Sequence, residues 1–352
     1  MNLLVIPTYN RSAKLQRVLD WYRSEGLKAR VVILDASSEP VHQEGNRKAV
    51  ASCGGFAQHI PTPGQDDVAQ RIYNFLESVD DDVFAVGNDE DAYFPEFLGQ
   101  AFELLRSDPS YVLAAGRYVT SARPLLGMRR ITYWTDRFLS LDVDEAEPAL
   151  RVINFQRLNG GGVPPLYWSV RRKSAFLESC RLAHGLRTGS AHELIDQINS
   201  CVLGKISISA YPMLLRDESR VKYQPGANRD DGRLYIGADD LERIEQLAAV
   251  KWERDVGVAV RAVTSWYRAK SCEESYQSRL NDTSYCGFSP PPDAQRRPML
   301  RWLQGAIRGS CVAGILLSQV FAYAYFLVYM SKSGRGRRFL KMTRTLDVNK
   351  AG

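Results

Sequence analysis

Three consecutive carboxylates occupy residues 89–91, and only Gly87 and Asn88 separate them from the apolar run 83–86. Their mutual repulsion is unfavourable unless water or a cation relieves it. In an extended or turning backbone, Asp89 and Asp91 can point the same way. Mg²⁺ and Mn²⁺ bind through one or two such carboxylates plus substrate phosphates. The alternative is a solvated acidic turn that caps a helix starting near Pro95. The position at the end of a buried strand favours the cation.

Two further polar clusters follow apolar runs nearer the N-terminus. Residues 3–6 form a continuous apolar run, typical of a strand buried on both faces. The cluster after that run consists of Pro7, Thr8, Tyr9, Asn10 and Arg11. Residues 31–34 form a second run, which ends at Asp35, with Ser37 close behind. Ligands of open α/β sheets bind outside the carboxyl ends of the strands. All three clusters are therefore expected along one edge of one sheet.

The surrounding pattern predicts the elements that hold these clusters. Further strands are expected at 56–60, 83–86 and 111–115, and helices at 12–25, 66–79 and 95–106. This alternation predicts an α/β fold with a mostly parallel sheet and helices on both faces. Beyond residue 120 the sequence pattern predicts helices at 145–158, 173–183, 192–203 and 239–269, and Gly257 interrupts the last of these. Strands are expected at 166–170 and 205–211, and a mobile loop at 216–235.

Three stretches carry a family resemblance: "LLVIPTYNRSAKLQRVLDWY", "VVILDASS" and "VFAVGNDEDAYFPEFL". In order and spacing they resemble the N-terminal half of family-2-type GT-A glycosyltransferases, in particular a bacterial subgroup with a first motif of the form I-P-T-Y-N-R. The resemblance implies a GT-A (Rossmann-like) fold over residues 1–215. It covers residues 1–120 best, weakens to about 215, and does not extend into the C-terminal helical extension.

The resemblance also implies roles for individual residues. The first loop, 7–11, and Asp35 with Ser37 would hold the nucleoside of a nucleotide-sugar. Asp89 and Asp91 would match the D-x-D metal site, with Glu90 beside the donor. Two residues depart from the commoner family pattern: Ala36 replaces a glycine, and Asn88 precedes the D-x-D.

Inverting transfer needs a general base for the acceptor hydroxyl. In the resembled fold this base comes from a Glu or Asp at the start of a helix, and "TGSAHELIDQ" (188–197) fits that place. Glu193 is the first choice and Asp196 the second. The alternative is a capping box formed by Ser190 and Glu193, which needs no catalysis. His192 is interpreted as a surface histidine rather than a third metal ligand.

Arginines and aromatic residues offer weaker candidates. Arg71 is expected to pair with diphosphate oxygens, ahead of the loop arginines Arg216 and Arg220. The glycines of 159–165 permit close approach to a ligand, and Tyr167 and Trp168 could stack on a sugar face. Aromatic residues in an apolar strand are, however, more often part of a core.

Composition limits the classes of partner. The chain has 352 residues, a formal charge of +6, and six cysteines without a C-x-x-C pair, so reduced thiols in a cytosolic compartment are expected. Residues 296–344 hold ten Lys and Arg residues and no Asp or Glu, so the basic excess is C-terminal. A basic stripe with interleaved aromatics on the main domain is missing, and no nucleic-acid partner is expected.

The C-terminal end contains 22 residues without a charge, 309–330. As a helix they would extend about 33 Å, enough to cross a bilayer core. A single span, an interfacial helix and a buried helix all fit, and the basic flanks favour membrane attachment. The predicted organisation is a donor half (1–120), an acceptor half (121–215), a helical region with a linker (216–295) and a membrane-associating segment (296–352).

With the resemblance, the sequence features imply a metal-dependent, inverting glycosyltransferase at the cytoplasmic face of the inner membrane. It would use a nucleotide-sugar and a saccharide or lipid-linked acceptor to make bacterial surface polysaccharide or glycolipid. Two alternatives stay open. A sugar-phosphate nucleotidyltransferase needs a Gly-rich loop after the first strand, which "IPTYNR" lacks. A catalytically silent nucleotide-sugar binder would need neither Asp91 nor Glu193.

Overall fold

The computed structural model describes residues 2–65, 67–125, 128–133, 142–158, 166–217 and 236–281. The chain divides into two compact units, Met1–Val119 with Arg137–Arg268, and Thr120–Asp136 with Ala269–Gly352. The first unit contains the sheet edge and helices discussed below. Residues 236–268 belong to this first unit. The predicted domain boundaries stay predictions.

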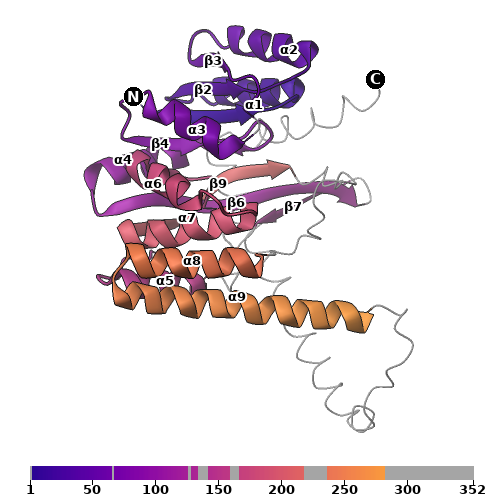
Figure 1. The fold of residues 1–352 in the computed structure, drawn as a ribbon. Helices are drawn as coiled ribbons and strands as arrows, with labels where there is room; N and C mark the ends of the chain where they lie inside the picture. The colour runs from indigo at the N-terminus through magenta and orange to yellow at the C-terminus, as the bar shows by residue number, and fades with distance from the viewer. Residues whose placement is uncertain are drawn as a thin grey trace. The chain divides into compact units, whose positions relative to one another are not determined.

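The sheet has the strand order β3-β2-β1-β4-β8-β6-β9-β5, with β7 paired to β6 (Figure 1). The first four strands along this order are mutually parallel: β1 (Leu3–Thr8), β2 (Arg30–Asp35), β3 (Ala57–Pro61) and β4 (Val83–Val86). The remaining strands are β5 (Ala92–Tyr93), β6 (Tyr111–Leu125), β7 (Met128–Tyr133), β8 (Val170–Arg172) and β9 (Lys205–Asp217). β8 is antiparallel to β4 and β6, and β5 is antiparallel to β9.

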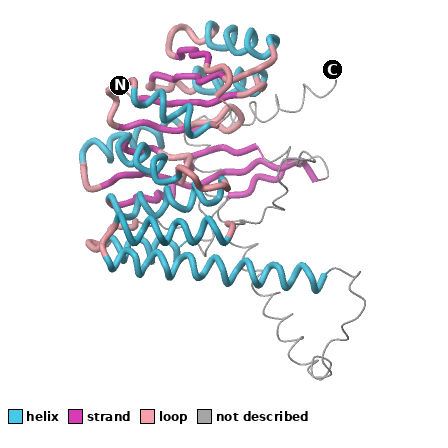
Figure 2. The backbone as a smooth tube through the Cα atoms, viewed as in Figure 1, coloured by secondary structure: helices cyan, strands magenta, loops and turns pink. Residues whose placement is uncertain are grey.

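Helices follow the first strands in alternation (Figure 2), which confirms the predicted α/β class. They are α1 (Ser12–Ser24), α2 (Pro40–Ala51), α3 (Val68–Glu77), α4 (Pro95–Ser107), α5 (Pro148–Leu158), α6 (Lys173–Ala183), α7 (Gly189–Leu203), α8 (Ala238–Lys251) and α9 (Arg254–Asn281). β1, β2 and β4 carry continuous apolar runs because both of their faces are covered, whereas the edge strand β3 is only partly buried.

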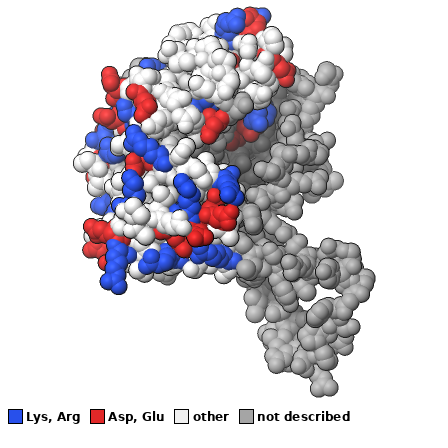
Figure 3. All heavy atoms as spheres, viewed as in Figure 1, with Lys and Arg blue, Asp and Glu red and all other residues white. Residues whose placement is uncertain are grey.

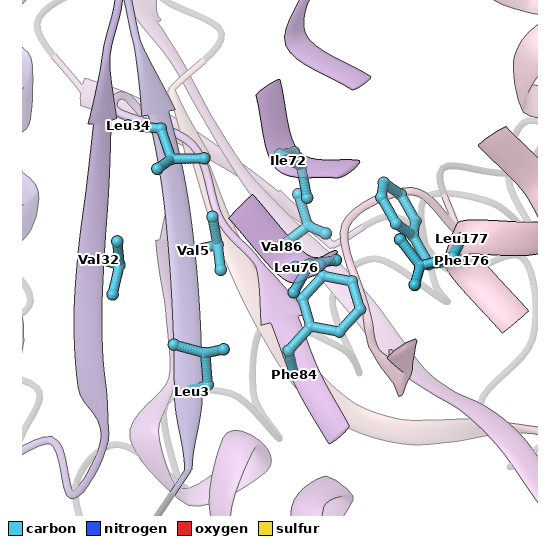
Figure 4. Packing of buried hydrophobic residues seen from close by; sticks show 10 residues of the cluster. All are labelled: Leu3, Val5, Val32, Leu34, Ile72, Leu76, Phe84, Val86, Phe176 and Leu177. Atoms are coloured by element: carbon cyan, nitrogen blue, oxygen red, sulfur yellow. The ribbon is translucent and has the colours of Figure 1, made fainter. Parts of the chain in front are cut away.

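One face of the sheet packs on α3 and α6 (Figure 4). The strands contribute Leu3, Val5, Val32, Leu34, Phe84 and Val86, and the helices contribute Ile72, Leu76, Phe176 and Leu177. Side chains alternate between the faces of a strand, so Leu4 and Ile6 point the other way, and they too are fully buried. The core therefore lies on both faces of the strands that end in the polar clusters.

Several element boundaries differ from the predictions. The helix α2 was not predicted, because its buried face has only Asn46, Ala49 and Val50 and it contains Gly45. The strand expected at 166–170 is wrong in position, since β8 begins only at Val170. The helical region breaks at extended Trp252, and Gly257 lies within the first turns of α9.

Surface charges of both signs are interspersed over the described face shown in Figure 3. Exposed ion pairs such as Arg23–Asp20 and Arg47–Glu44 lie within single helices at i, i+3 spacing. Such pairs contribute at most about 0.5 kcal/mol each. Stability therefore comes mainly from the apolar layers.

No helix among the described residues is both long enough and apolar enough to cross a membrane. The predicted membrane-associating segment, 296–352, lies outside the described residues, as do 159–165 and Arg220.

Candidate functional site

Thr8 connects the first loop to the acidic turn after β4. Its Oγ1 donates a hydrogen bond of 2.7 Å to Asp89 Oδ2, and both side chains are buried. Arg11, whose side chain is 48% exposed, donates to the other carboxylate oxygen, Oδ1, at 3.3 Å. The β1 loop therefore holds both oxygens of Asp89.

Glu90 lies in the same ion-pair cluster. Arg11 Nη1 is 3.5 Å from Glu90 Oε1, and Lys14 Nζ from the first turn of α1 pairs with Glu90 Oε2. Two cations thus offset the repulsion between these carboxylates. The sequence analysis expected this charge balance to come from a metal or from solvent and did not identify Lys14.

Asn88 shapes the acidic turn. Its Oδ1 accepts hydrogen bonds from the backbone amides of Glu90 (2.8 Å) and Asp91 (2.6 Å), which is an Asx turn. Its Nδ2 donates to Asp91 Oδ2 at 2.8 Å. The departure from the usual family pattern at residue 88 therefore has a structural role: Asn88 orients the Asp91 carboxylate.

Burial raises the pKa of Asp89, because desolvation outweighs the hydrogen bond from Thr8 and the charge of Arg11. Asp89 is 3% exposed and Asp91 is 4% exposed. A buried carboxylate held above its ordinary pKa gains from a nearby cation.

The donor set fits a divalent cation only in part. The described residues contain no group of three or more His, Cys, Asp or Glu side chains that could hold a metal. Two buried carboxylates in one turn are the number that Mg²⁺ uses when phosphates complete its shell. Asp89 and Asp91 are therefore a possible half-site, which substrate oxygens would have to complete.

Asp35, at the end of β2, is 4% exposed and both of its oxygens accept hydrogen bonds. The Ser37 amide donates to Oδ1 at 2.9 Å, and His59 Nε2 lies 2.8 Å from Oδ2. Burial raises the pKa of Asp35, but the hydrogen bonds from His59, Ser37 and Asn46 outweigh burial and hold this pKa well below its usual value. Asp35 is therefore an ionised, acceptor-only carboxylate at neutral pH.

Asn10 joins the first loop to the second. Its backbone is left-handed, with φ of 52°. Its backbone amide donates to Ser37 Oγ at 2.9 Å. Its side-chain oxygen Oδ1 accepts from the backbone amides of Ser38 (3.1 Å) and Glu39 (3.2 Å). Asparagine tolerates this conformation because its short side chain bonds nearby backbone. Tyr9, 47% exposed, lies above the junction with its hydroxyl 3.2 Å from Ser38 Oγ.

Arg71 has a different environment from the one expected for a diphosphate ligand. It is buried, and its Nη1 donates to the carbonyl oxygens of Thr8 (3.0 Å) and Leu34 (3.2 Å). These bonds join α3 to the carboxyl ends of β1 and β2. In this structure the Arg71 guanidinium stabilises the chain at the ends of β1 and β2, where the first two loops begin.

The start of α7 lies at the same sheet edge as these loops. Because β8 runs antiparallel to β4, it ends where β4 begins, and Lys173 N donates to Asp82 O there (2.8 Å). Helix α6 begins at this point and runs back toward the edge where β4 ends. α7 packs on α6 in the opposite direction, since Asn199 near its end bonds the carbonyl of Ala175 (3.2 Å). The first turn of α7 is thus at the edge where β1, β2 and β4 end.

Glu193 is half-buried near this first turn. The N-cap of α7 is Thr188, whose Oγ1 accepts from the Ala191 amide, so the alternative of a capping box with Ser190 as its N-cap is wrong. The charge of Glu193 adds to burial in raising the pKa of Tyr267 to about 12, which places the carboxylate near α9. His192 Nε2 lies 3.1 Å from the carbonyl oxygen of Leu186, in the loop that precedes α7.

Asp196, the second choice for the base, is paired in the core. Both of its oxygens accept from Arg171 of β8, at 2.9 and 2.5 Å. Arg171 is 0% exposed and stacks over Phe176, with its guanidinium carbon 5.0 Å from the ring centroid. A carboxylate fixed in this bidentate pair is not available to an acceptor, and Asp196 is corrected here to a structural residue.

Tyr167 and Trp168 pack against the core cluster, which is the alternative that the sequence allowed. Tyr167 contacts both Trp168 and Phe176 edge-on or tilted, with centroids 5.1 and 6.0 Å apart. They therefore belong to the periphery of the core cluster rather than to a sugar-binding surface.

Asp240 is a further residue that the sequence analysis missed. It lies in the first turn of α8, and its carboxylate accepts from the Arg187 amide (2.9 Å) and from Thr188 Oγ1 (3.0 Å). This anchors the N-terminus of α7. His59 was missed as well. Neither Asp240 nor His59 stands in a recognisable motif, and only the fold brings each residue to its partner.

Comparisons with known proteins give a distant structural likeness only. No protein-family model and no curated protein matches the sequence. The chain is similar to the crystal structure of S. aureus TarS 1–349, with a TM-score of 0.49 and 13% identity, covering 82% of this chain and 75% of that chain. It is also similar to S. aureus TarS 1–349 in complex with UDP-GlcNAc, with a TM-score of 0.46 and 12% identity, covering 76% of this chain and 71% of that chain.

Proposed function

We propose that this protein is a glycosyltransferase with a GT-A-like fold that uses a nucleotide-sugar donor. One observation carries the proposal: a continuous set of hydrogen bonds joins the loops after β1, β2 and β4 at their carboxyl ends. It runs from Asp35 through Ser37 and Asn10 to the first loop, and from Thr8 to Asp89. In open α/β sheets this edge is the place where ligands bind.

The chemistry of this edge suits a nucleoside diphosphate. At one end the ionised Asp35 offers an acceptor for nucleoside N–H or hydroxyl groups. At the other end Arg11 and Lys14 lie among the carboxylates of Asp89 and Glu90. Cations here can pair with diphosphate oxygens. The donor would thus bind with its nucleoside over β2 and its diphosphate at the acidic turn.

Mg²⁺ or Mn²⁺ is proposed as the cofactor, held by Asp89 and Asp91. When bound, such an ion stabilises negative charge on the diphosphate leaving group. The protein's own part is to orient Asp91 through Asn88 and to hold Asp89 through Thr8.

Glu193 is the proposed general base, and its place in the first turns of α7 supports this role. The acceptor hydroxyl would lose its proton to Glu193 while its oxygen forms a bond to the anomeric carbon. The bond from that carbon to the diphosphate oxygen breaks, and the nucleoside diphosphate leaves. Attack opposite the leaving group inverts the anomeric configuration.

The acceptor class and the location are proposals from the sequence. A saccharide or lipid-linked hydroxyl acceptor of bacterial surface polysaccharide or glycolipid synthesis fits the resemblance. Membrane association at the cytoplasmic face rests on the composition of 296–352. A silent nucleotide-sugar binder is the second candidate, because the Asp35 cluster alone would suffice for it.

Calorimetric titration with UDP-, GDP- and CMP-sugars, including UDP-GlcNAc, tests the proposal. Wild type should bind one nucleotide class, more tightly with Mn²⁺ than with EDTA, and Asp91→Ala should lose this metal dependence. Asp20→Ala is the matched control, because the Asp20 side chain is 43% exposed and pairs with Arg23 of the same helix. Binding that ignores both Mn²⁺ and Asp91 would favour the silent binder. No binding of any donor would contradict the proposal.

A further inference from the structure

His59 is the closest titratable side chain to Asp35 in the described site. It lies on β3, the edge strand of the parallel half of the sheet. In the register of the two strands His59 pairs with Ile33, two positions before Asp35. Side chains two positions apart on a strand share a face, so His59 and Asp35 lie on the same face of the sheet.

The hydrogen bond has one direction. An ionised carboxylate can only accept, so the proton between Asp35 Oδ2 and His59 Nε2 is on the histidine. The imidazole ring is 14% exposed and the carboxyl group 2% exposed. The pair is therefore largely shielded from water, and a hydrogen bond to a charged group is strong in such a place.

The two oxygens of Asp35 are held from opposite sides. The Ser37 amide fixes Oδ1 within the β2 loop, and His59 fixes Oδ2 from β3. Ser37 Oγ in turn accepts from the Asn10 amide (2.9 Å) and from Asn46 Nδ2 of α2 (3.2 Å). Removing His59 would leave Asp35 Oδ2 without its bond from β3 and so loosen the orientation of the carboxylate, while the bonds from Ser37 and Asn46 would remain.

We propose that His59 is a positioning residue for nucleotide binding: by donating from Nε2, it fixes the Asp35 carboxylate in the orientation that accepts a hydrogen bond from the nucleoside. This inference rests on the proposed function. It assigns to β3 a part in donor recognition, exerted through Asp35, that no sequence motif indicates.

Variants at residue 59 separate positioning from mere strand packing. His59→Leu removes the donor and keeps an apolar side chain of similar reach. His59→Gln keeps an N–H near the position of Nε2. Gln58→Leu is the control, because Gln58 is an exposed neighbour on the opposite face of the same strand. Thermal unfolding of each variant establishes that it folds.

Calorimetry with UDP, GDP and CMP measures the effect. We expect His59→Leu to bind the preferred nucleotide about tenfold more weakly than wild type. His59→Gln should recover most of that loss, and Gln58→Leu should bind like wild type. Loss of affinity in both residue-59 variants, or in neither, would overturn the inference, since a positioning hydrogen bond requires rescue by the amide.

A carboxyl-carbon NMR titration of Asp35 adds a readout that needs no nucleotide. The pKa of Asp35 should rise in His59→Leu and stay low in His59→Gln. If the titration behaves this way but wild type binds no nucleotide, the proposed function is wrong and the inference falls with it. If wild type binds nucleotide and His59→Leu binds it equally well, the proposed function stands and the inference alone is wrong.

Discussion

Thr8 and Asp89 are 81 residues apart in the chain and share a buried hydrogen bond of 2.7 Å. The bond joins the end of β1 to the turn after β4, the neighbouring parallel strand. It places the first loop against the acidic turn without any contribution from backbone pairing at that point. The relative position of the proposed nucleoside and diphosphate subsites depends on this contact.

Replacing Thr8 by valine removes this donor at nearly constant volume. Since a buried carboxylate oxygen then lacks one partner, the free energy of unfolding should fall by about 1–3 kcal/mol. Nucleotide affinity should fall as well. Chemical denaturation and calorimetry measure the two effects. Thr62→Val is the matched control, because the buried Thr62 hydroxyl has no hydrogen-bond partner among the described residues. An equal loss in both variants would contradict the role assigned to Thr8.

Asp89→Asn tests whether the buried Asp89 carboxylate lowers folding stability at neutral pH while it is required for nucleotide binding. The pKa of Asp89 is raised by burial, so the stability it contributes is present below its ordinary pKa of 3.8 and is lost as the pH rises through the higher folded-state value. At neutral pH the ionised group is therefore destabilising. We expect the variant to melt higher than wild type at pH 7, with a smaller difference at pH 3, and to lose nucleotide binding. A lower melting temperature at pH 7 would show that Thr8 and Arg11 outweigh the burial.

Asp35 should have the opposite pH dependence. Its folded-state pKa is lowered, so its contribution to stability is present above the unfolded-state pKa and disappears as the pH falls below about 4 toward the folded-state value. Comparing wild type with Asp35→Asn by thermal unfolding between pH 3 and pH 7 measures it. The wild-type advantage should shrink on acidification. A constant difference across this range would mean that the lowered pKa is wrong.

Substitutions at Glu193 and Asp196 should have different effects. Substitution of Asp196 should lower folding stability, and substitution of Glu193 should abolish sugar transfer. Breaking the buried Arg171–Asp196 pair with Asp196→Asn should cost about 3 kcal/mol or more of folding stability, because it leaves Arg171 buried without its counter-charge. Glu193→Gln should leave the melting temperature nearly unchanged and abolish sugar transfer while nucleotide binding persists. Thermal unfolding, calorimetry and a transfer assay are needed on both variants. Full transfer activity in Glu193→Gln would exclude it as the base.

Arg11 and a divalent cation should compete for Asp89. Because Arg11 is about half exposed, its ion pairs add little to stability, and Arg11→Ala should melt like wild type. Without Arg11, Mn²⁺ alone should bind more tightly, while nucleotide in EDTA should bind more weakly. Arg47→Ala, which removes an exposed helical ion pair on α2, is the control. Weaker Mn²⁺ binding in Arg11→Ala would contradict the competition.

The sequence predicted best the features that depend on local patterns. Apolar runs ending in polar clusters identified β1, β2 and β4 and their common edge, because buried parallel strands leave an unambiguous pattern. The helix 173–183 was predicted with its observed bounds. Helix α2 was missed, since a helix that buries mainly Asn46 and Ala49 has almost no apolar periodicity.

The partners of the site residues could not be predicted from spacing. The sequence predicts Arg71 as a ligand of diphosphate oxygens and Asp196 as the second choice for the base, yet the first bonds two strand-end carbonyls and the second pairs with Arg171. The partners of Arg71 and Asp196 depend on how α3 and β8 pack in the fold. The local sequence around each residue does not encode that packing. The same reason hid His59 and Asp240.

A crystal structure with Mn²⁺ and the nucleotide-sugar selected by calorimetry tests the central claim most directly. The account predicts the nucleoside within hydrogen-bonding distance of Asp35. It also predicts an anomalous scattering peak between the diphosphate and the carboxylates of Asp89 and Asp91. A nucleotide bound elsewhere, or bound at this edge with no metal near Asp91, would contradict it.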